Sequence, residues 1–230
     1  MAWLLLVAPV AALLILIGYW HLVLAEGAYL GPRAVRLLYD WTARGYDRLK
    51  GFDAATEAYF LGRPLAAALR SWERPRVLDV ATGTGRLPRT LLAQPNFRGW
   101  VCGLDLSARM LRIAQQHLAR RAGQAGLLQA AASPLPFAAE QFEAVCCLEA
   151  MEFFADAGAA LDDMVRVLRP GGWLLITNRV GWEARLLPGR TWSRRELISL
   201  LRERPLTDIS VRPWQVYYDL VWARKRGGCH

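Results

Sequence analysis

Apolar and polar residues follow three different patterns along this chain of 230 residues. Residues 2–25 are almost wholly apolar and contain no Asp, Glu, Lys or Arg. Residues 33–72 space their apolar side chains at helical intervals. From residue 75 onward, short apolar runs alternate with helix-like segments. The patterns predict, in order, one long apolar helix, a helical region and an α/β core.

The alternation after residue 75 predicts a mainly parallel sheet with helices on both of its faces. We expect strands at about 76–81, 99–104, 126–130, 142–148, 172–178, 207–212 and 214–224. We expect helices at about 85–94, 107–121, 157–168 and 193–204, the last opened by a capping-box pattern at Ser193 and Glu196. The chain then divides into residues 1–26, 27–72 and 73–226.

The first of these segments has the length and composition of a membrane span. Trp3 and Trp20 would stand about 26 Å apart at helical rise, close to a hydrocarbon core of about 30 Å. A cleaved signal peptide is an alternative, with Val23 and Ala25 as cleavage-site residues, but no basic region precedes Trp3. A buried core helix is the second alternative, although such helices are usually shorter and amphipathic. We expect residues 3–24 to span a membrane once.

Basic residues follow this segment closely. Before Gly51 the chain carries Arg33, Arg36, Arg44, Arg48 and Lys50. Positive residues flanking a span favour the cytoplasmic side. The expected topology is therefore a single-pass anchor with the following domain in the cytoplasm.

Two helices are expected in the second segment, at 33–50 and 53–72, with Asp53 as a plausible N-cap. Residues 27–31 are the expected hinge between the anchor and these helices. Plain packing against the core explains the helices as well as a role in covering a ligand does.

A glycine-rich turn follows the first expected strand. The run 77–80 carries Asp79 near its end and breaks into Ala81, Thr82, Gly83, Thr84 and Gly85. A strand feeding such a turn and then a helix is typical of proteins that bind nucleotide-like cofactors. The second expected strand ends in Asp105, 20 residues after Gly85, where a carboxylate would meet ribose hydroxyls.

Together these segments resemble the first motifs of class I S-adenosylmethionine (SAM) methyltransferases, in particular the quinone C-methyltransferase branch. That family carries an acid–x–Gly–x–Gly–x–Gly signature, and here Ala81 stands at the first glycine position. Residues 134–137 resemble its Leu-Pro-Phe turn, and residues 168–172 its Leu-Arg-Pro-Gly-Gly turn. The resemblance covers about residues 75–178 and implies a Rossmann-like sheet of seven strands and SAM as cofactor.

The resemblance also implies roles for single residues. Asp79 would hold the methionyl amino group, Gly83 and Gly85 would let the backbone approach the cofactor, and Asp105 would accept two ribose hydroxyls. Leu106 and Met110 would line the adenine. Asp79 as a turn acid and Asp105 as a helix cap are the structural alternatives.

One position departs from the family pattern. An acid for the adenine amino group often precedes the Leu-Pro-Phe turn, but this chain has Ala130, Ala131, Ala132 and Ser133 there. Ser133 or backbone groups would have to replace the missing carboxylate. This departure raises the possibility of a non-catalytic SAM-binding domain.

Glu149 and Glu152 follow the fourth expected strand, at the edge where open α/β sheets bind ligands. Either is a candidate general base or acceptor-orienting group, and a solvated or capping acid is the alternative. No Asn/Asp-Pro-Pro-aromatic motif and no Pro-Cys pair occurs there, which argues against two kinds of nucleic-acid methylation.

Charge and cysteine content narrow the remaining classes. The formal net charge is +9, but the basic residues are spread along the chain, which favours proximity to anionic lipid over a nucleic-acid substrate. The four cysteines form no C-x-x-C pair and do not cluster with the three histidines, so we expect no metal site.

Three functions remain as hypotheses. The first is methyl transfer to a small, lipophilic or lipid-like acceptor at a membrane. The second is a non-catalytic, anchored SAM-binding or scaffold domain. The third is an NAD-dependent oxidoreductase, against which Pro88 stands where the dinucleotide motif has its third glycine. The acceptor and the oligomeric state do not follow from the sequence.

Overall fold

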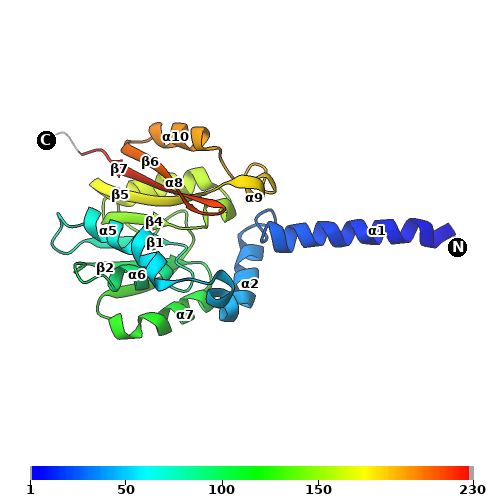
Figure 1. Ribbon diagram of the computed structural model, residues 1–230, viewed down its shortest axis with the longest axis horizontal. Helices are drawn as coiled ribbons and strands as arrows, with labels where there is room; N and C mark the ends of the chain where they lie inside the picture. The colour runs from blue at the N-terminus through cyan, green and yellow to red at the C-terminus, as the bar shows by residue number, and fades with distance from the viewer. Residues whose placement is uncertain (1, 228–230) are drawn as a thin grey trace.

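A seven-stranded sheet forms the centre of the structure, a computed structural model that describes residues 2–227, with side chains from Val7 onward (Figure 1). The strands are β1 (Arg76–Val80), β2 (Trp100–Asp105), β3 (Ala125–Gln129), β4 (Phe142–Cys147), β5 (Leu168–Arg179), β6 (Leu206–Gln215) and β7 (Tyr218–Lys225). They lie in the order β3-β2-β1-β4-β5-β7-β6. The first five are parallel, and β7 is antiparallel to both β5 and β6. The predicted seven-stranded, Rossmann-like α/β fold is confirmed.

Helices precede the sheet and connect its strands. They are α1 (Ala2–Tyr19), α2 (Pro32–Thr42), α3 (Tyr46–Lys50), α4 (Ala54–Glu57), α5 (Arg63–Ala68), α6 (Arg86–Leu92), α7 (Ala108–Leu118), α8 (Ala157–Val167), α9 (Gly181–Arg185) and α10 (Arg194–Arg202). Asp53, Ser107, Asp156 and Ser193 cap four of them, each side chain accepting a backbone N–H. The capping box at Ser193 and the cap at Asp53 are therefore confirmed.

Alternate residues of the strands enter two cores, as the two-residue period of a strand requires. Leu78 and Val145 face α8 and α10, whereas Val77 and Ala144 face α5 and α6. The helices thus cover both faces of the sheet. This packing fixes the carboxyl ends of the five parallel strands along one edge, where ligands bind in open α/β sheets.

Several expected elements have different bounds in the structure, and three of them show a clear physical reason. Strand β5 begins at Leu168 instead of residue 172, because Leu168 already pairs with Phe142 before the turn. The helix expected at 33–50 is interrupted by a 3₁₀ turn at Ala43–Gly45, where glycine weakens the α-helix. The helix expected at 53–72 widens into a π-helical turn at Ala58–Gly62.

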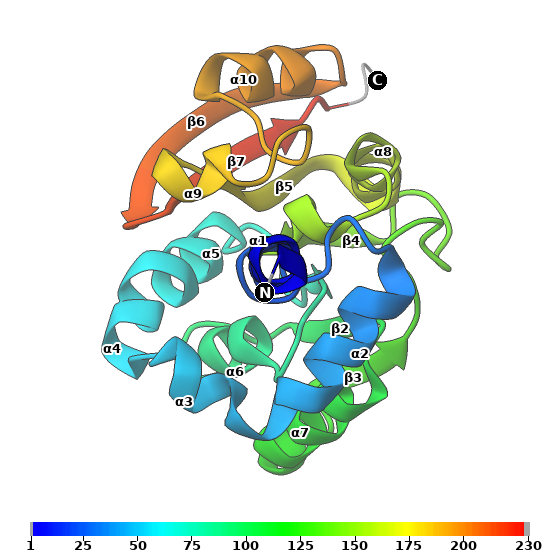
Figure 2. The ribbon, with the colours of Figure 1, turned by 90° about the vertical axis from the view of Figure 1, so that its right-hand side faces the viewer.

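Helix α1 leaves the domain from the carboxyl-edge side, and Figure 2 looks along it toward the sheet. Val7–Leu24 is long and apolar enough to cross a membrane, and none of it is buried in the structure. The predicted position of Trp3 at a membrane interface concerns a side chain outside the described residues.

The inner end of this helical segment is attached to the domain. The indole N–H of Trp20 donates to the carbonyl of Leu186 at 3.2 Å, and the Tyr29 hydroxyl donates to the carbonyl of Pro188 at 2.8 Å. Ala25 and Ala28 are buried beside Leu187. Residues 20–29 are therefore part of the packed domain and are not a free hinge.

Candidate active site

A cavity of about 280 Å³ lies at the carboxyl edge of the sheet. Its sheet wall consists of residues at or just after the ends of β1 and β2, among them Ala81 and Asp105. Its cover wall comes from the helical segment between the apolar helix and β1, including Val35 and Tyr39, and from residues that follow β4, including Glu149. The cavity is thus the place where segments far apart in the sequence meet.

The glycine-rich turn contributes two different kinds of position. Ala81 and Gly83 both line the cavity and both have left-handed backbone conformations, with φ of 59° and 54°. A Cβ on Gly83 would meet no atom within 4 Å, so its space lies open toward the cavity. A Cβ on Gly85 would lie 3.2 Å from the Cβ of Ala114. Gly85 therefore permits α6 to pack against α7 and does not line the cavity.

Asp79 is buried below this turn and is absent from the cavity wall. Its carboxylate accepts a hydrogen bond from the Thr82 hydroxyl at 2.6 Å. Burial raises the pKa of Asp79 to about 7, and the neighbouring Asp105 adds to the rise. A carboxyl group in this state readily exchanges its proton when a cation approaches.

Asp105 lines the cavity at the end of β2. Its two carboxylate oxygens accept the backbone N–H groups of Gly83 and Ser107, each at 2.8 Å. Burial raises its pKa, and those backbone donors oppose the rise. Asp105 therefore joins the glycine turn to the start of α7, while Ser107 provides the helix cap.

Neighbours of Asp105 divide between the cavity and the core. Leu106 lines the cavity, whereas Met110 is 1% exposed and belongs to the core side of α7. Ser133 lines the opposite part of the wall with Ala130–Ala132, and its hydroxyl donates to Asp163 at 2.9 Å. A carboxylate thus stands behind Ser133 and orients its hydroxyl.

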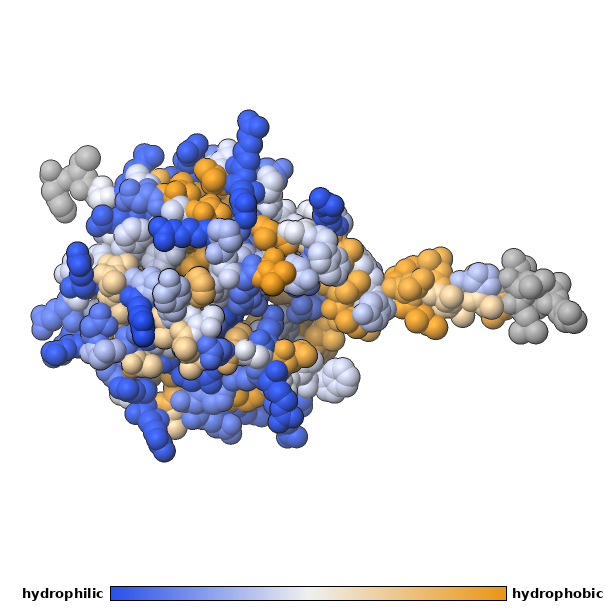
Figure 3. Space-filling view, viewed as in Figure 1, coloured by the Kyte–Doolittle hydropathy of each residue, from blue (hydrophilic) through white to orange (hydrophobic). Residues whose placement is uncertain are grey.

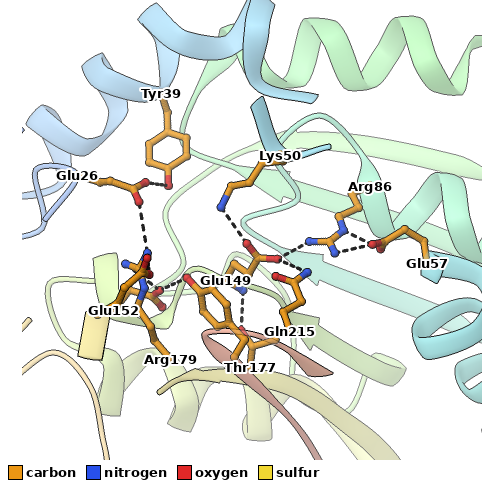
Figure 4. Close-up of polar contacts among 12 residues, drawn as sticks. Glu26, Tyr39, Lys50, Glu57, Arg86, Glu149, Glu152, Thr177, Arg179 and Gln215 are labelled. Atoms are coloured by element: carbon orange, nitrogen blue, oxygen red, sulfur yellow. Dashed lines mark hydrogen bonds and ion pairs between the residues drawn. The ribbon is translucent and has the colours of Figure 1, made fainter. Parts of the chain in front are cut away.

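Glu149 lies at the centre of a charged cluster on the cavity wall (Figure 4). Its carboxylate accepts from the ammonium of Lys50 at 2.9 Å, from the guanidinium of Arg86 at 2.5 Å and from the amide of Gln215 at 3.2 Å. Its backbone N–H donates to the Thr177 hydroxyl at 2.6 Å. Its φ of 52° is unusual for a side chain with a Cβ, so these contacts hold it in a strained conformation.

The charges around Glu149 decide its ionisation. Burial alone would raise its pKa, but Lys50 and Arg86 together hold that pKa below its ordinary value. Arg86 is itself held by Glu57 through two hydrogen bonds of 2.6 and 2.7 Å. Glu149 is therefore an ionised hydrogen-bond acceptor at neutral pH.

Glu152 occupies a separate position. It is 2% exposed, accepts from the Tyr218 hydroxyl at 2.6 Å and lies 3.7 Å from Arg179. Burial raises its pKa. Glu152 does not line the main cavity.

Several residues of the cluster were not identified by the sequence reasoning. Lys50 was counted among the basic residues after the anchor, and Arg86, Glu57 and Gln215 were assigned no role. One sequence signal pointed to Arg86: it follows Gly85 at the start of a helix, where the helix dipole disfavours a cation. The roles proposed for Asp79, Gly85, Met110 and the other site residues stay predictions.

Comparison with known proteins identifies the domain. Residues 77–172 match the family described as "Methyltransferase domain". The chain is 30% identical over 154 residues to the ubiquinone/menaquinone biosynthesis C-methyltransferase UbiE of Geotalea daltonii, covering 60% of this chain and 66% of that protein. It is 34% identical over 146 residues to the demethylmenaquinone methyltransferase of Mycobacterium sp. (strain KMS), covering 63% and 59%. The chain thus spans less than two thirds of the length of these relatives.

Solved structures show the same fold at low identity. The [4+2]-cyclase SpnF superposes with a TM-score of 0.69 at 18% identity, over 86% of this chain and 97% of that one. A SAM-dependent methyltransferase from Aquifex aeolicus gives a TM-score of 0.54 at 18% identity, over 75% and 98%. With the family match over residues 77–172 and the curated relatives, the chain contains a class I SAM-dependent methyltransferase domain, and these comparisons indicate SAM as the cofactor of that domain.

Proposed function

We propose that the protein transfers a methyl group from SAM to a small, lipophilic acceptor that it takes from a membrane. The observation that supports this most is the composition of the cavity wall. Pro32, Val35 and Arg36 line the cavity and lie on α2, only a few residues after the apolar segment. A cavity at the root of an apolar helix is suited to a substrate that is dissolved in lipid.

The sheet wall fits SAM in three respects. The Gly83 position is open toward the cavity, Asp105 presents a carboxylate beside it, and Leu106 offers an apolar surface for a base. Asp79 lies behind the turn, where it would attract the methionyl ammonium. SAM, when bound, supplies a methyl group on a positively charged sulfur. Positioning and exclusion of water then account for much of the catalysis.

The cover wall fits an aromatic or polyisoprenoid-like acceptor. Tyr39, Tyr46, Phe153 and Phe154 line it, and aromatic side chains supply apolar contact area with defined geometry. The two relatives named above carry names of quinone methyltransferases, which supports an acceptor of similar chemistry. The spread of basic residues along the chain argues against a nucleic-acid acceptor.

Glu149 is best suited to orient the acceptor. An ionised carboxylate accepts a hydrogen bond from an acceptor hydroxyl, but a pKa held low by two cations makes a weak base. Glu152 has the higher pKa but does not face the main cavity. We therefore assign Glu149 an orienting role.

The membrane part of the proposal rests on α1 and on the residues after it. Lys50 is ion-paired with Glu149 and Arg36 lines the cavity. Arg33, Arg44 and Arg48 remain as exposed cations. Their positive charges beside the proposed span favour a cytoplasmic position for the domain. SAM is a cytosolic metabolite, so this orientation also gives the cavity access to it.

Two experiments test this function. Alkaline carbonate extraction of membranes should leave the full-length protein in the pellet, and protease added to intact cells should spare the domain. Release into the soluble fraction would contradict the span, and cleavage from outside would contradict the orientation. A soluble version should begin near residue 19, because deletion to residue 26 would remove the packed contacts of Trp20 and Ala25.

The catalytic part is tested with purified protein, SAM and a lipid extract. Formation of S-adenosylhomocysteine together with a methylated lipid-soluble product would support the proposal. Binding of SAM without turnover on any extract would favour the anchored scaffold. Binding of NAD in place of SAM would favour the oxidoreductase. Because a cyclase shares this fold, the product itself has to be identified.

A further inference from the structure

Helix α2 has a second apolar surface that the cavity does not use. Its inner side packs on the domain: the Asp40 carboxylate accepts from the Ser107 hydroxyl at 2.5 Å, and Arg109 donates to the Asp40 carbonyl at 3.2 Å. Val35 and Tyr39, also on this inner side, join the core around the root of α1. The opposite side of the helix therefore faces away from the domain.

Large apolar side chains occupy that outer side. Leu37 is 60% exposed and Trp41 is 80% exposed, while Leu30, just before the helix, is 50% exposed. Leu37 and Trp41 are four residues apart, so they lie on one helical stripe. Leu30 is an exposed apolar residue that precedes the helix. Such a stripe of large apolar groups in water is unfavourable unless a partner covers it.

Cations flank the stripe. Arg33 and Arg44 are exposed and lie on the same side of the helix by their spacing of four and three residues from Leu37 and Trp41. Neither forms an ion pair among the residues that the structure describes. Leucine and tryptophan bordered by arginine are typical of a helix that lies in the surface of an anionic bilayer.

The position of α2 points to the same partner. Figure 1 shows α2 running across the direction of α1, and Figure 2, viewed along α1, shows α2 on the side nearest the viewer. Figure 3 shows apolar side chains gathered where α1 leaves the domain. A span along α1 would therefore place the outer side of α2 against the headgroup layer.

We propose that α2 lies in the interface of an anionic bilayer with Leu30, Leu37 and Trp41 inserted and with Arg33 and Arg44 at the headgroups. This proposal rests on the proposed membrane span but not on methyl transfer. The same helix carries Val35, Arg36 and Tyr39 into the cavity wall. One helix then separates the lipid from the cavity.

The test places nitroxide labels on the full-length protein in nanodiscs made of phosphatidylglycerol, an anionic lipid. Cys102, Cys146 and Cys147 are buried. With Cys229→Ser as the background, the label then attaches only to the cysteine that each variant introduces. Trp41→Cys reports on α2, and Ile15→Cys reports on the span. Arg120→Cys is the matched control. Arg120 is exposed and follows the C-terminal end of α7, whereas α2 packs on the N-terminal end of that helix.

The result expected is that oxygen, which concentrates in lipid, relaxes the labels at positions 15 and 41 more than a water-soluble nickel chelate does. Position 120 should show the reverse. Lipid contact at 15 combined with a water-like signal at 41 would overturn the proposal and leave the span intact. Water-like signals at both would overturn the span and the proposal together. Methyl-transfer assays on the same samples report on the proposed function separately.

Two further arms distinguish the partner. Replacing phosphatidylglycerol by phosphatidylcholine should reduce lipid contact at position 41, and Arg33→Gln with Arg44→Gln should remove that dependence on lipid charge. Insensitivity to lipid charge would overturn the anionic assignment. Dipolar coupling between labels at position 41 on two copies would show that a second copy covers the stripe and would overturn the proposal.

Discussion

The two walls of the cavity are built in different ways. The sheet wall is made of turns that follow β1 and β2, and residues 79–107 provide its backbone donors and its Asp105 carboxylate. The cover wall is held by side chains that meet across the chain, such as Lys50 and Glu149, 99 residues apart. The sheet wall suits a cofactor that is always SAM, whereas the cover wall can vary with the acceptor. The predictions below test this division, from the largest expected effect to the smallest.

Replacement of Gly83 by Val should abolish SAM binding while the fold remains. The substitution puts a branched side chain into the open space of the cavity at φ +54°. Calorimetry with SAM and thermal unfolding measure the two properties. Gly189→Val is the matched control, since Gly189 has φ +72° with open surroundings away from the cavity. Equal SAM affinity in both variants would mean that the turn does not hold the cofactor.

Glu149→Gln should lower the free energy of unfolding by about 3–5 kcal/mol, because it leaves Lys50 without its charged partner and removes one of the two carboxylates that pair with Arg86. Glu143→Gln is the control: Glu143 is equally buried at the other end of β4 and pairs with Arg169 at 2.6 Å. Both variants should lose stability, but only the change at Glu149 should raise the acceptor KM. An unchanged acceptor KM would show that Glu149 takes no part in acceptor binding.

The stability that Glu149 gains from its ion pairs with Lys50 and Arg86 depends on pH with a defined sign. The pKa of Glu149 is lowered in the folded protein, so its stabilisation is present above its ordinary pKa of 4.5 and is lost as pH falls through the lowered value. Chemical denaturation between pH 3 and pH 6 measures this loss. Glu149→Gln should flatten the profile, and an identical profile would contradict the ion-pair assignment.

Asp105→Ala should weaken SAM binding by about ten- to a hundredfold, as expected for the loss of hydrogen bonds to a charged acceptor. The structure adds a second cause, because Asp105 also holds the N–H groups of Gly83 and Ser107. Titration of SAM and of adenosine measures the effect. Asp53→Ala, which removes a helix cap away from the cavity, should leave the affinity unchanged. Wild-type affinity in a folded Asp105→Ala protein would refute the ribose assignment.

SAM affinity should rise with pH by up to about tenfold per unit until about pH 7 and then level off. Burial raises the pKa of Asp79 to about 7, and a bound ammonium favours the ionised carboxylate, so binding must release a proton. Calorimetry in buffers of different ionisation enthalpy counts that proton. Asp79→Asn should remove the proton release. Proton release that persists in this variant would exclude Asp79 from a role in cofactor binding.

Sequence reasoning located the sheet wall because its information is local. The spacing from Gly85 to Asp105 is set by one helix and one strand, and parallel pairing of β1 with β2 brings the ends of both strands together. The number of strands and the family then follow from repeated local patterns. The same reasoning did not separate Gly83 from Gly85, because only the packing of Ala114 distinguishes them.

The cover wall was largely beyond prediction. Lys50 has the same local pattern as the exposed arginines that precede it, and its pairing with Glu149 depends on how α3 lies across the end of β4. Gln215 reaches Glu149 only because β6 and β7 form a hairpin at the edge of the sheet. Contacts of this kind join residues at least 60 positions apart, so no local pattern records them.

The hydrogen bonds that fasten Trp20 and Tyr29 to the segment after α9 have a mechanical consequence. Since the root of α1 is folded into the domain, the helix and the domain share one orientation. A spanning helix that is longer than the hydrocarbon layer is thick responds by tilting. Under the proposed span, such a tilt would turn the whole domain about its attachment and change the angle at which the cavity meets the lipid. The thickness of the bilayer would then act as a control on access to the site.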